Sequence, residues 1–352
     1  MNEKNIFKLD ETGCLSQEDT KKYYSRIGFF YLILGGVSFA ISLLASFIAQ
    51  IYFPWIFKNS MVLLLVDYGI SFVAIYLIAT PLAAIALKPL PRVAPLKEKM
   101  KFKHLFSAFC ICFAFMLSGA YFSNFLEMLI SNITGLELTN PIEETLSTGH
   151  ILINAIGMGI IFPILEELLF RKLLCNKLLP LGEKQAIVIS AVVFGFIHGN
   201  IFQFAYSFLI GLVFGYIYVK TGKLIYTIIF HSAINLFSGV FASYATSGPA
   251  VEEFMKLLED ETLIYDYEKL ATLIEPYALQ LIPYLIYSYV LMGLSIAGFV
   301  IFFILTLRRK ITLEQGILPP ENNHTFSNFF LTTGVASAVA FVAFKFIFSI
   351  II

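Results

Sequence analysis

The sequence predicts an all-α protein, a polytopic membrane bundle of about eight or nine transmembrane helices. Hydrophobic residues make up 58% of the 352 positions, charged residues only 14%, and the mean hydropathy is +0.81. A soluble domain usually contains about 25% charged residues. The low charge content therefore indicates a chain surrounded by lipid. The apolar residues also gather in runs of about 20 residues, the length that crosses a bilayer.

Nine apolar runs are candidates for membrane spans, and eight is the nearest alternative count. They cover residues 28–53, 61–87, 105–130, 148–170, 185–199, 201–219, 224–244, 281–307 and 328–352. The fifth run is short and the fourth continues directly into charged residues, which leaves both of their boundaries open. No segment between the runs is long enough to form a separate soluble domain, and no repeat of fixed period is visible.

The charges between the runs predict the orientation of the bundle, because basic residues favour the cytosolic side. The loops after the second, fourth, sixth and eighth runs are basic. The 131–147 loop instead has three glutamates and no Lys or Arg, and the 245–280 loop has eight acidic residues against two lysines. All basic loops share one side if the N-terminus is cytosolic. We expect the 245–280 loop to form amphipathic helices at the outer surface.

The remaining charge and cysteine patterns limit the classes of partner. The first 27 residues mix five basic with five acidic residues, unlike a cleavable signal peptide, so we expect a retained cytosolic tail. The formal net charge is zero, which argues against nucleic acid as a partner. The basic run 97–104 is expected to meet anionic lipid headgroups. The four cysteines show no metal-ligand spacing.

Six polar residues within or beside the apolar runs form a candidate site. They are Glu166, Glu167, Arg171, His198, His231 and Asn235. Ionisable groups within a membrane are costly and indicate function. Glu167 and Arg171 are four residues apart, so they share a helix face and can neutralise each other. That pairing leaves Glu166 free to face a cavity.

The helix rise predicts that these groups share one level of the membrane. If the chain turns near residues 180–182, Glu166 and His198 both lie about 22–24 Å from that turn. His231 and Asn235, four residues apart, lie about 13–20 Å from the turn at 221–222. Lys172 and Lys177 mark a cytosolic interface about 10–15 Å from Glu166, so we expect the pocket to open to the cytosol. Lys345 interrupts the last apolar run near its predicted outer end, so its long side chain is expected to extend to the outer interface.

The residue types suit hydrolysis of a peptide bond. Glu166 can act as a general base for water, and His198 can help to orient that water. His231 and Asn235 can donate hydrogen bonds to the oxyanion that forms. The sequence contains no Gly-x-Ser-x-Gly elbow and no Cys beside a His, which argues against a covalent nucleophile. A zinc ion held by Glu166, His198 and His231 is the open alternative.

Three motifs carry a resemblance to a known family. They are Glu-Glu-x-x-x-Arg at 166–171, Phe-x-x-x-His at 194–198 and His-x-x-x-Asn at 231–235, in this order on successive helices. Together they resemble the CPBP family, which groups the type II CAAX prenyl endopeptidases with bacteriocin-processing and Abi-type membrane proteins. The resemblance covers about residues 148–243.

The resemblance implies an intramembrane protease, glutamate- or metal-dependent, in the cell membrane of a bacterium. Its substrate would be a membrane-associated, prenylated or amphipathic peptide or a lipidated protein. The family pattern assigns water activation to Glu166 and His198, oxyanion stabilisation to His231 and Asn235, and support to the ion pair.

The chain then divides into five parts around this core. They are a cytosolic N-terminal tail (1–27), N-terminal transmembrane helices (28–147), the CAAX-protease-like core (148–243), an acidic extracytoplasmic loop (244–280) and C-terminal transmembrane helices (281–352). Two other classes remain open. A non-proteolytic immunity or sensor-regulating protein would keep the fold without turnover, whereas a secondary transporter would be expected to show inverted repeats, which are not visible.

Overall fold

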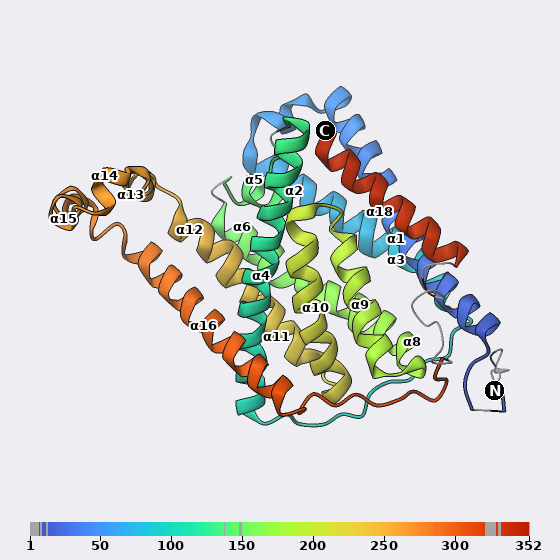
Figure 1. Cartoon of the computed structure of the whole chain (residues 1–352). Coiled ribbons are helices and arrows are strands. Elements are labelled where there is room, and N and C mark those ends of the chain that lie inside the picture. The colour runs from blue at the N-terminus through green and yellow to red at the C-terminus, as the bar shows by residue number, and fades with distance from the viewer. Residues whose placement is uncertain are drawn as a thin grey trace.

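The computed structural model describes residues 7, 9–11, 13–136, 138–147, 150–320, 329 and 332–351. All named elements within these ranges are helices (Figure 1), so the predicted fold class is confirmed. Part of the predicted tail 1–27 and Glu137 of the 131–147 loop lie outside the described residues.

Seven helical segments of the described chain are long and apolar enough to cross a membrane. They are α1 (Gln17–Tyr52), Ser60–Leu87 with α2 (Ser60–Ser71) and α3 (Thr80–Leu87), α4 (Phe102–Thr134), Ile151–Leu181, α10 (Ile201–Thr221), Leu224–Thr246 with α11 (Leu224–Asn235) and α12 (Ala242–Thr246), and α16 (Ile282–Leu307). The protein is therefore an integral membrane protein.

Two of the nine predicted runs are not among the seven spanning segments found in the described part of the chain. The run at 185–199 forms α9 (Glu183–Ile197), whose 15 residues reach only about 22 Å. The run at 328–352 contains α18 (Thr333–Ile351), which counts as a shorter apolar helix over Thr333–Ser349. Apolar content alone predicts a span, whereas length decides whether the helix can cross.

Helices α9 and α10 form an antiparallel hairpin whose turn lies inside the bundle. Gly199 follows α9 with φ +69°, the left-handed conformation that ends many helices. The side chain of Asn200 then accepts a hydrogen bond from the backbone N–H of Gln203 at 2.9 Å and caps α10. Gly211 of α10 faces Ala191 of α9, so the two helices pack closely. Helix α10 also packs against α4, which in turn packs against α16.

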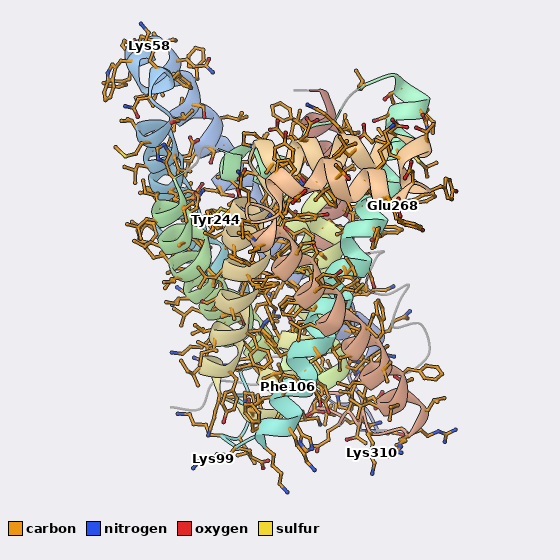
Figure 2. The ribbon with its side chains drawn as sticks, turned by 90° about the vertical axis from the view of Figure 1, so that its left-hand side faces the viewer. Lys58, Lys99, Phe106, Tyr244, Glu268 and Lys310 are labelled. Carbon is orange, nitrogen blue, oxygen red and sulfur yellow. The ribbon has the colours of Figure 1, made fainter. Side chains whose placement is uncertain are left out.

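The two ends of the bundle differ in charge (Figure 2). Lys99 and Lys310 lie at one end, which we call the basic end, whereas Glu268 and also Lys58 lie toward the other, which we call the acidic end after the residues of its loops. The acidic end carries α5 (Pro141–Ser147) and, from the predicted acidic loop, α13 (Pro249–Glu259), α14 (Glu261–Ile264) and α15 (Tyr267–Ile274). Residues 245–280 thus form helices, as their amphipathic pattern predicts.

Two extended segments cover the basic end. The first follows α3, where Val93 and Glu98 donate backbone N–H groups to the carbonyls of Asn176 and Thr221. The second follows α16, where Leu318 donates its N–H to the carbonyl of Pro180. These backbone hydrogen bonds join the long helix Ile151–Leu181 and α10 at their basic ends.

Lys345 of α18 does not reach the outer interface as predicted. Its Nζ donates a hydrogen bond to the carbonyl of Ile197 at 3.2 Å, the last residue of α9. The final carbonyls of a helix lack partners within the helix and attract cations. The end of α9 inside the bundle therefore offers Lys345 an acceptor that the sequence pattern does not reveal.

Candidate active site

Four of the six predicted residues line one pocket of about 860 Å³. Glu166 comes from α7 (Phe162–Glu167), His198 from the residue after α9, and His231 and Asn235 from α11. Glu167 and Arg171 lie behind the pocket wall, where both side chains are fully buried. The structure thus brings the three predicted motifs together.

A chain of polar contacts runs from Arg171 to the pocket. Arg171 Nε donates to Glu167 Oε2 at 3.1 Å, as the four-residue spacing predicts. Glu167 Oε1 lies 3.1 Å from His231 Nδ1. On the opposite side of the imidazole, His231 Nε2 lies 3.4 Å from Glu166 Oε2. Both glutamates therefore contact the same histidine, one from behind the wall and one from within the pocket.

The partners of His231 determine where its protons can lie. Glu167, paired with Arg171, is an acceptor only, so His231 Nδ1 carries a proton and donates it. His231 Nε2 and Glu166 Oε2 can then form a hydrogen bond only when one proton lies between them. Glu166 and His231 thus form a pair that can hold one shared proton facing the pocket.

Arg171 is held by more than its carboxylate partner. Its Nη1 donates to Ser190 Oγ at 3.2 Å, and its guanidinium carbon lies 5.4 Å from the ring centroid of Phe194 and 5.9 Å from that of Phe214. Such cation–π contacts favour a desolvated guanidinium. Its Nη2 has no hydrogen-bond partner among the described residues. The cation that neutralises Glu167 is therefore fixed in position without access to water.

His198 is oriented by its own helix. Its Nδ1 lies 2.9 Å from the carbonyl of Phe194, and a carbonyl only accepts, so Nδ1 is the protonated nitrogen and Nε2 is left as an acceptor. The Phe194 ring meets both imidazoles edge-on, with its centroid 5.3 Å from that of His198 and 5.6 Å from that of His231. Phe194, the first residue of the second motif, thus acts as a spacer between the two histidines.

Asn235 is held by an irregularity in the helix that carries Glu166. Residues Gly157–Ile161 form a π-helical turn in which the N–H of Phe162 bonds to the carbonyl of Gly157, five residues back. In an α-helix that N–H would bond to Met158. Pro163, the next residue, has no N–H to donate and favours such a break. The carbonyl of Met158 instead accepts from Asn235 Nδ2 at 2.9 Å.

The predicted zinc alternative needs three converging donors. In the part of the chain that the structure describes, no three His, Cys, Asp or Glu side chains come together as a group that could hold a metal ion. His231 directs its two nitrogens at Glu166 and Glu167, and His198 directs Nδ1 at a backbone carbonyl. These donors do not fit a three-ligand zinc shell.

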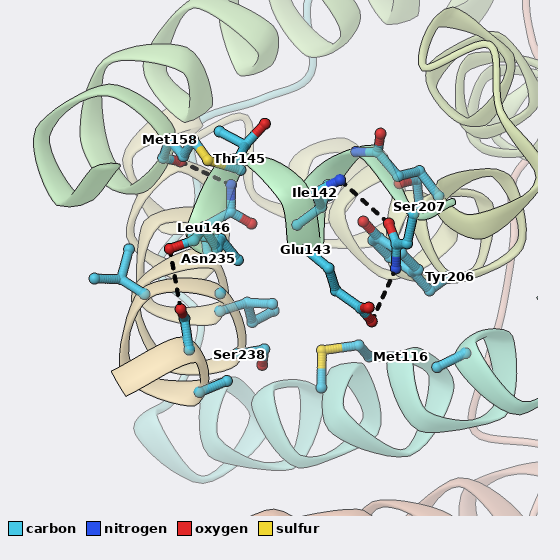
Figure 3. A pocket seen from close by; sticks show the side chains of 18 of the residues that line it. Met116, Ile142, Glu143, Thr145, Leu146, Met158, Tyr206, Ser207, Asn235 and Ser238 are labelled. Atoms are coloured by element: carbon cyan, nitrogen blue, oxygen red, sulfur yellow. Dashed lines mark hydrogen bonds between the residues drawn. The ribbon is translucent and has the colours of Figure 1, made fainter. Parts of the chain in front are cut away.

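The pocket opens toward the acidic end, and the predicted opening near Lys172 and Lys177 is wrong. Its wall continues from Glu166 to Asn140, just before α5, and then to Ser243 of α12 and Ser247 just after that helix. It also includes Glu143 of α5 (Figure 3). The pocket is lined on one side by His198 and Gln203 of the α9–α10 turn and on the other by residues 140–143 at the start of α5, so it extends from the end of α9 to α5.

Sequence reasoning missed the pocket wall formed by α2 and α5. Tyr68 of α2 lines the pocket and donates its hydroxyl to Asn154 Oδ1 at 2.7 Å. Asn154 is 1% exposed, a buried amide inside the fourth apolar run. A polar residue at such a position was the available signal. No signal in the sequence indicated that α5 lines the pocket, because its residues have the composition of an ordinary acidic loop.

The comparisons with known proteins agree with the motifs. Residues 148–237 match the family described as type II CAAX prenyl endopeptidase Rce1-like. The chain is also 30% identical over 126 residues to the UPF0177 protein YxdF of Lactococcus lactis. That alignment covers 36% of this chain and 70% of the relative. No solved structure matches.

Proposed function

The chain belongs to the CPBP family of membrane proteins, and from this membership we propose that it is an intramembrane endopeptidase. The match to the Rce1-like family supports CAAX-type protease activity at the level of the family. The proposed reaction is hydrolysis of a peptide bond in a membrane-associated, prenylated or amphipathic peptide. The proposed orientation has the basic end and the N-terminus in the cytosol.

The observation that carries the proposal is the contact chain that ends at Glu166. Glu166 faces the pocket, whereas Glu167 and Arg171 stand behind His231 and fix its orientation. A carboxylate backed by an oriented imidazole is an arrangement suited to general-base catalysis. The fully buried ion pair holds this arrangement in place without itself meeting the substrate.

In the proposed mechanism, Glu166 takes a proton from a water molecule and shares it with His231 Nε2. His198 Nε2 accepts a hydrogen bond from the same water and orients it. The water oxygen then bonds to the substrate carbonyl carbon. Asn235 Nδ2 has a second N–H besides the one donated to Met158, and this N–H stabilises the oxyanion. The carbon–nitrogen bond breaks as the shared proton passes to the leaving amine.

The test is a comparison of peptides in membranes that contain the wild-type protein or Glu166→Gln. We expect some peptide termini to depend on Glu166 and their uncut precursors to accumulate in the variant, as measured by mass spectrometry. Glu268→Gln is the matched control, because it removes an exposed carboxylate on α15. Identical termini in all three membranes would overturn the proposal.

The cellular phenotype of two variants distinguishes proteolysis from the main alternative, a non-proteolytic role. If Glu166→Gln and His231→Ala both keep the full biological effect, a non-proteolytic immunity or sensor-regulating role is favoured. If the effect is lost while the protein still accumulates in the membrane, hydrolysis is favoured.

A further inference from the structure

The pocket carries a carboxylate that the proposed mechanism does not use. Glu143 of α5 lines the wall near the acidic end, together with Glu166, His198 and His231 as the other charged or titratable groups apart from tyrosines. No Lys or Arg lines the described wall. A cavity bounded by two carboxylates and no fixed cation favours a positively charged occupant and disfavours an acidic one.

Glu143 is positioned to meet an occupant. Its Oε1 accepts a hydrogen bond from Asn140 Nδ2 at 3.1 Å, while Asn140 Oδ1 accepts from the backbone N–H of Ile142. These contacts orient the carboxylate but provide no cation to neutralise it. Figure 3 shows Glu143 extending from α5 toward Met116 of α4. The hydrogen bond described for this carboxylate therefore comes from a neutral amide and not from a cation.

The wall formed by α4 and α16 is mostly apolar. Met116, Leu117 and Ala120 of α4 line it, and Leu291 of α16 lies beside them. This surface suits aliphatic side chains, and among the α4 and α16 residues of the described lining only Tyr287 adds a hydrogen-bonding side-chain group, its hydroxyl. An occupant that fits both features carries a cationic side chain next to apolar ones.

The approach to the pocket is negative as well. Residues 245–280 contain eight acidic side chains and two lysines, and they form the helices of the acidic end. Six of these acidic side chains are exposed, namely Glu252, Glu259, Asp260, Asp266, Glu268 and Glu275. An electrostatic field of this sign attracts cations to the end on which the pocket opens.

We propose that the pocket admits a cationic, partly apolar peptide segment from the acidic end, and that Glu143 selects it by pairing with a substrate Lys or Arg. This inference rests on the proposed protease function and names its substrate class. Glu143 is thus a specificity residue, while the reaction itself depends on Glu166.

The test is peptide binding to the Glu166→Gln protein in phosphatidylcholine nanodiscs, which removes both hydrolysis and anionic lipid. The probes are two fluorescent peptides of alternating residues, Leu with Lys and Leu with Glu, and empty nanodiscs are the blank. We expect the lysine peptide to bind more tightly than the glutamate peptide. Adding Glu143→Gln should weaken lysine-peptide binding roughly two- to fivefold, and adding Glu143→Lys should reverse the preference.

The matched control is Glu268→Gln in the same Glu166→Gln background, since it removes an equal charge outside the pocket. We expect it to change lysine-peptide affinity by much less than Glu143→Gln does. Equal effects of the two variants, or no preference for the lysine peptide, would overturn the inference. Failure of the protease proposal is a different result, in which charge-dependent binding persists but the wild-type protein cuts no peptide.

Discussion

The residue with the most constrained surroundings is Arg171. It and Glu167 are both 0% exposed, so neither charge can be relieved by water. Removing one partner of a buried ion pair leaves an uncompensated charge and costs about 3–5 kcal/mol. Replacing both can be nearly neutral, because the desolvation of the two charges is then avoided as well.

We therefore expect Arg171→Met to lower the midpoint of thermal unfolding of the purified protein substantially. The double variant Glu167→Gln/Arg171→Met should recover most of that loss. Unfolding followed by intrinsic fluorescence in detergent measures both. The single variant Glu167→Gln completes the comparison. If the losses of the two single variants simply add in the double variant, the two residues act independently and the prediction is wrong.

Asn235 offers a test of the oxyanion assignment. Loss of one hydrogen-bond donor to an oxyanion lowers kcat by about 100- to 1000-fold, and we expect a decrease of that order for Asn235→Ala. Steady-state cleavage of an identified peptide substrate measures it. Ser238→Ala is the control, because Ser238 lines the same pocket and its Oγ has no hydrogen-bond partner among the described residues. Equal losses in the two variants would contradict the assignment.

Spacing along the chain predicted some of these contacts and could not predict others. The four-residue spacing correctly predicted the contact between Glu167 and Arg171, because this spacing keeps the two side chains on one face of the helix. The contact between Glu166 and His231 was not predicted. Segments Gly157–Ile161 and Leu168–Cys175 are π-helical, which changes the rotation per residue and hence the direction of each side chain. A fixed 100° step cannot represent that change.

At the scale of the helices, the short hairpin α9–α10 is the feature that makes the pocket. Its turn carries His198 and ends inside the bundle, where the last carbonyls of α9 need partners. Lys345 supplies one to Ile197. Gly199 lies beside that contact, since a Cβ there would collide with the Lys345 side chain.

We predict that Lys345→Met lowers kcat more than it raises KM, because the substrate wall is intact while the His198 turn loses a support. The free energy of unfolding should fall by about 1.5–3 kcal/mol, the range for a hydrogen bond that involves a charged group. Lys345→Arg should restore most of the kcat, and Lys256→Met, on the exposed side of α13, should change neither quantity. A KM effect alone would argue against a positioning role.

The sequence predicted that residues 185–199 are helical and apolar, which is correct, and that they form a membrane span, for which the 15 residues of α9 are too few. Hydropathy reports the environment of a segment but not its partner elements. The adjoining turn residues Gly199 and Asn200 mark a helix end and a helix start. Read together with the length of α9, those two residues carry the signal for a hairpin that turns back.

For the whole molecule, the direction of the pocket follows from how its two ends are closed. Backbone hydrogen bonds from the segments after α3 and α16 join them to the basic end, whereas the pocket wall reaches α5 and Ser247 at the acidic end. The charge of the loops predicts which side of the membrane each end faces. It carries no information on which end is packed, and for that reason the opening was predicted at the wrong side.

Labelling of introduced cysteines tests which side of the membrane each end faces, separately from the end at which the pocket opens. The background is Cys14→Ser, because the other three cysteines are buried. With a membrane-impermeant maleimide on intact cells, we expect Ser247→Cys to react and Lys99→Cys to react only after permeabilisation. The reverse pattern would invert the orientation yet leave the pocket open at the acidic end.

Protection by a ligand then tests the opening itself. The leucine–lysine peptide should slow the labelling of Ser247→Cys, which lines the pocket, but not that of Tyr267→Cys, which is 75% exposed on α15. Both sites belong to the acidic end, so general attraction of the peptide to negative charge would slow them equally. Only occupation of the pocket gives selective protection, and its loss on adding Glu143→Gln would connect the entrance of the pocket to the residue proposed to select what enters it.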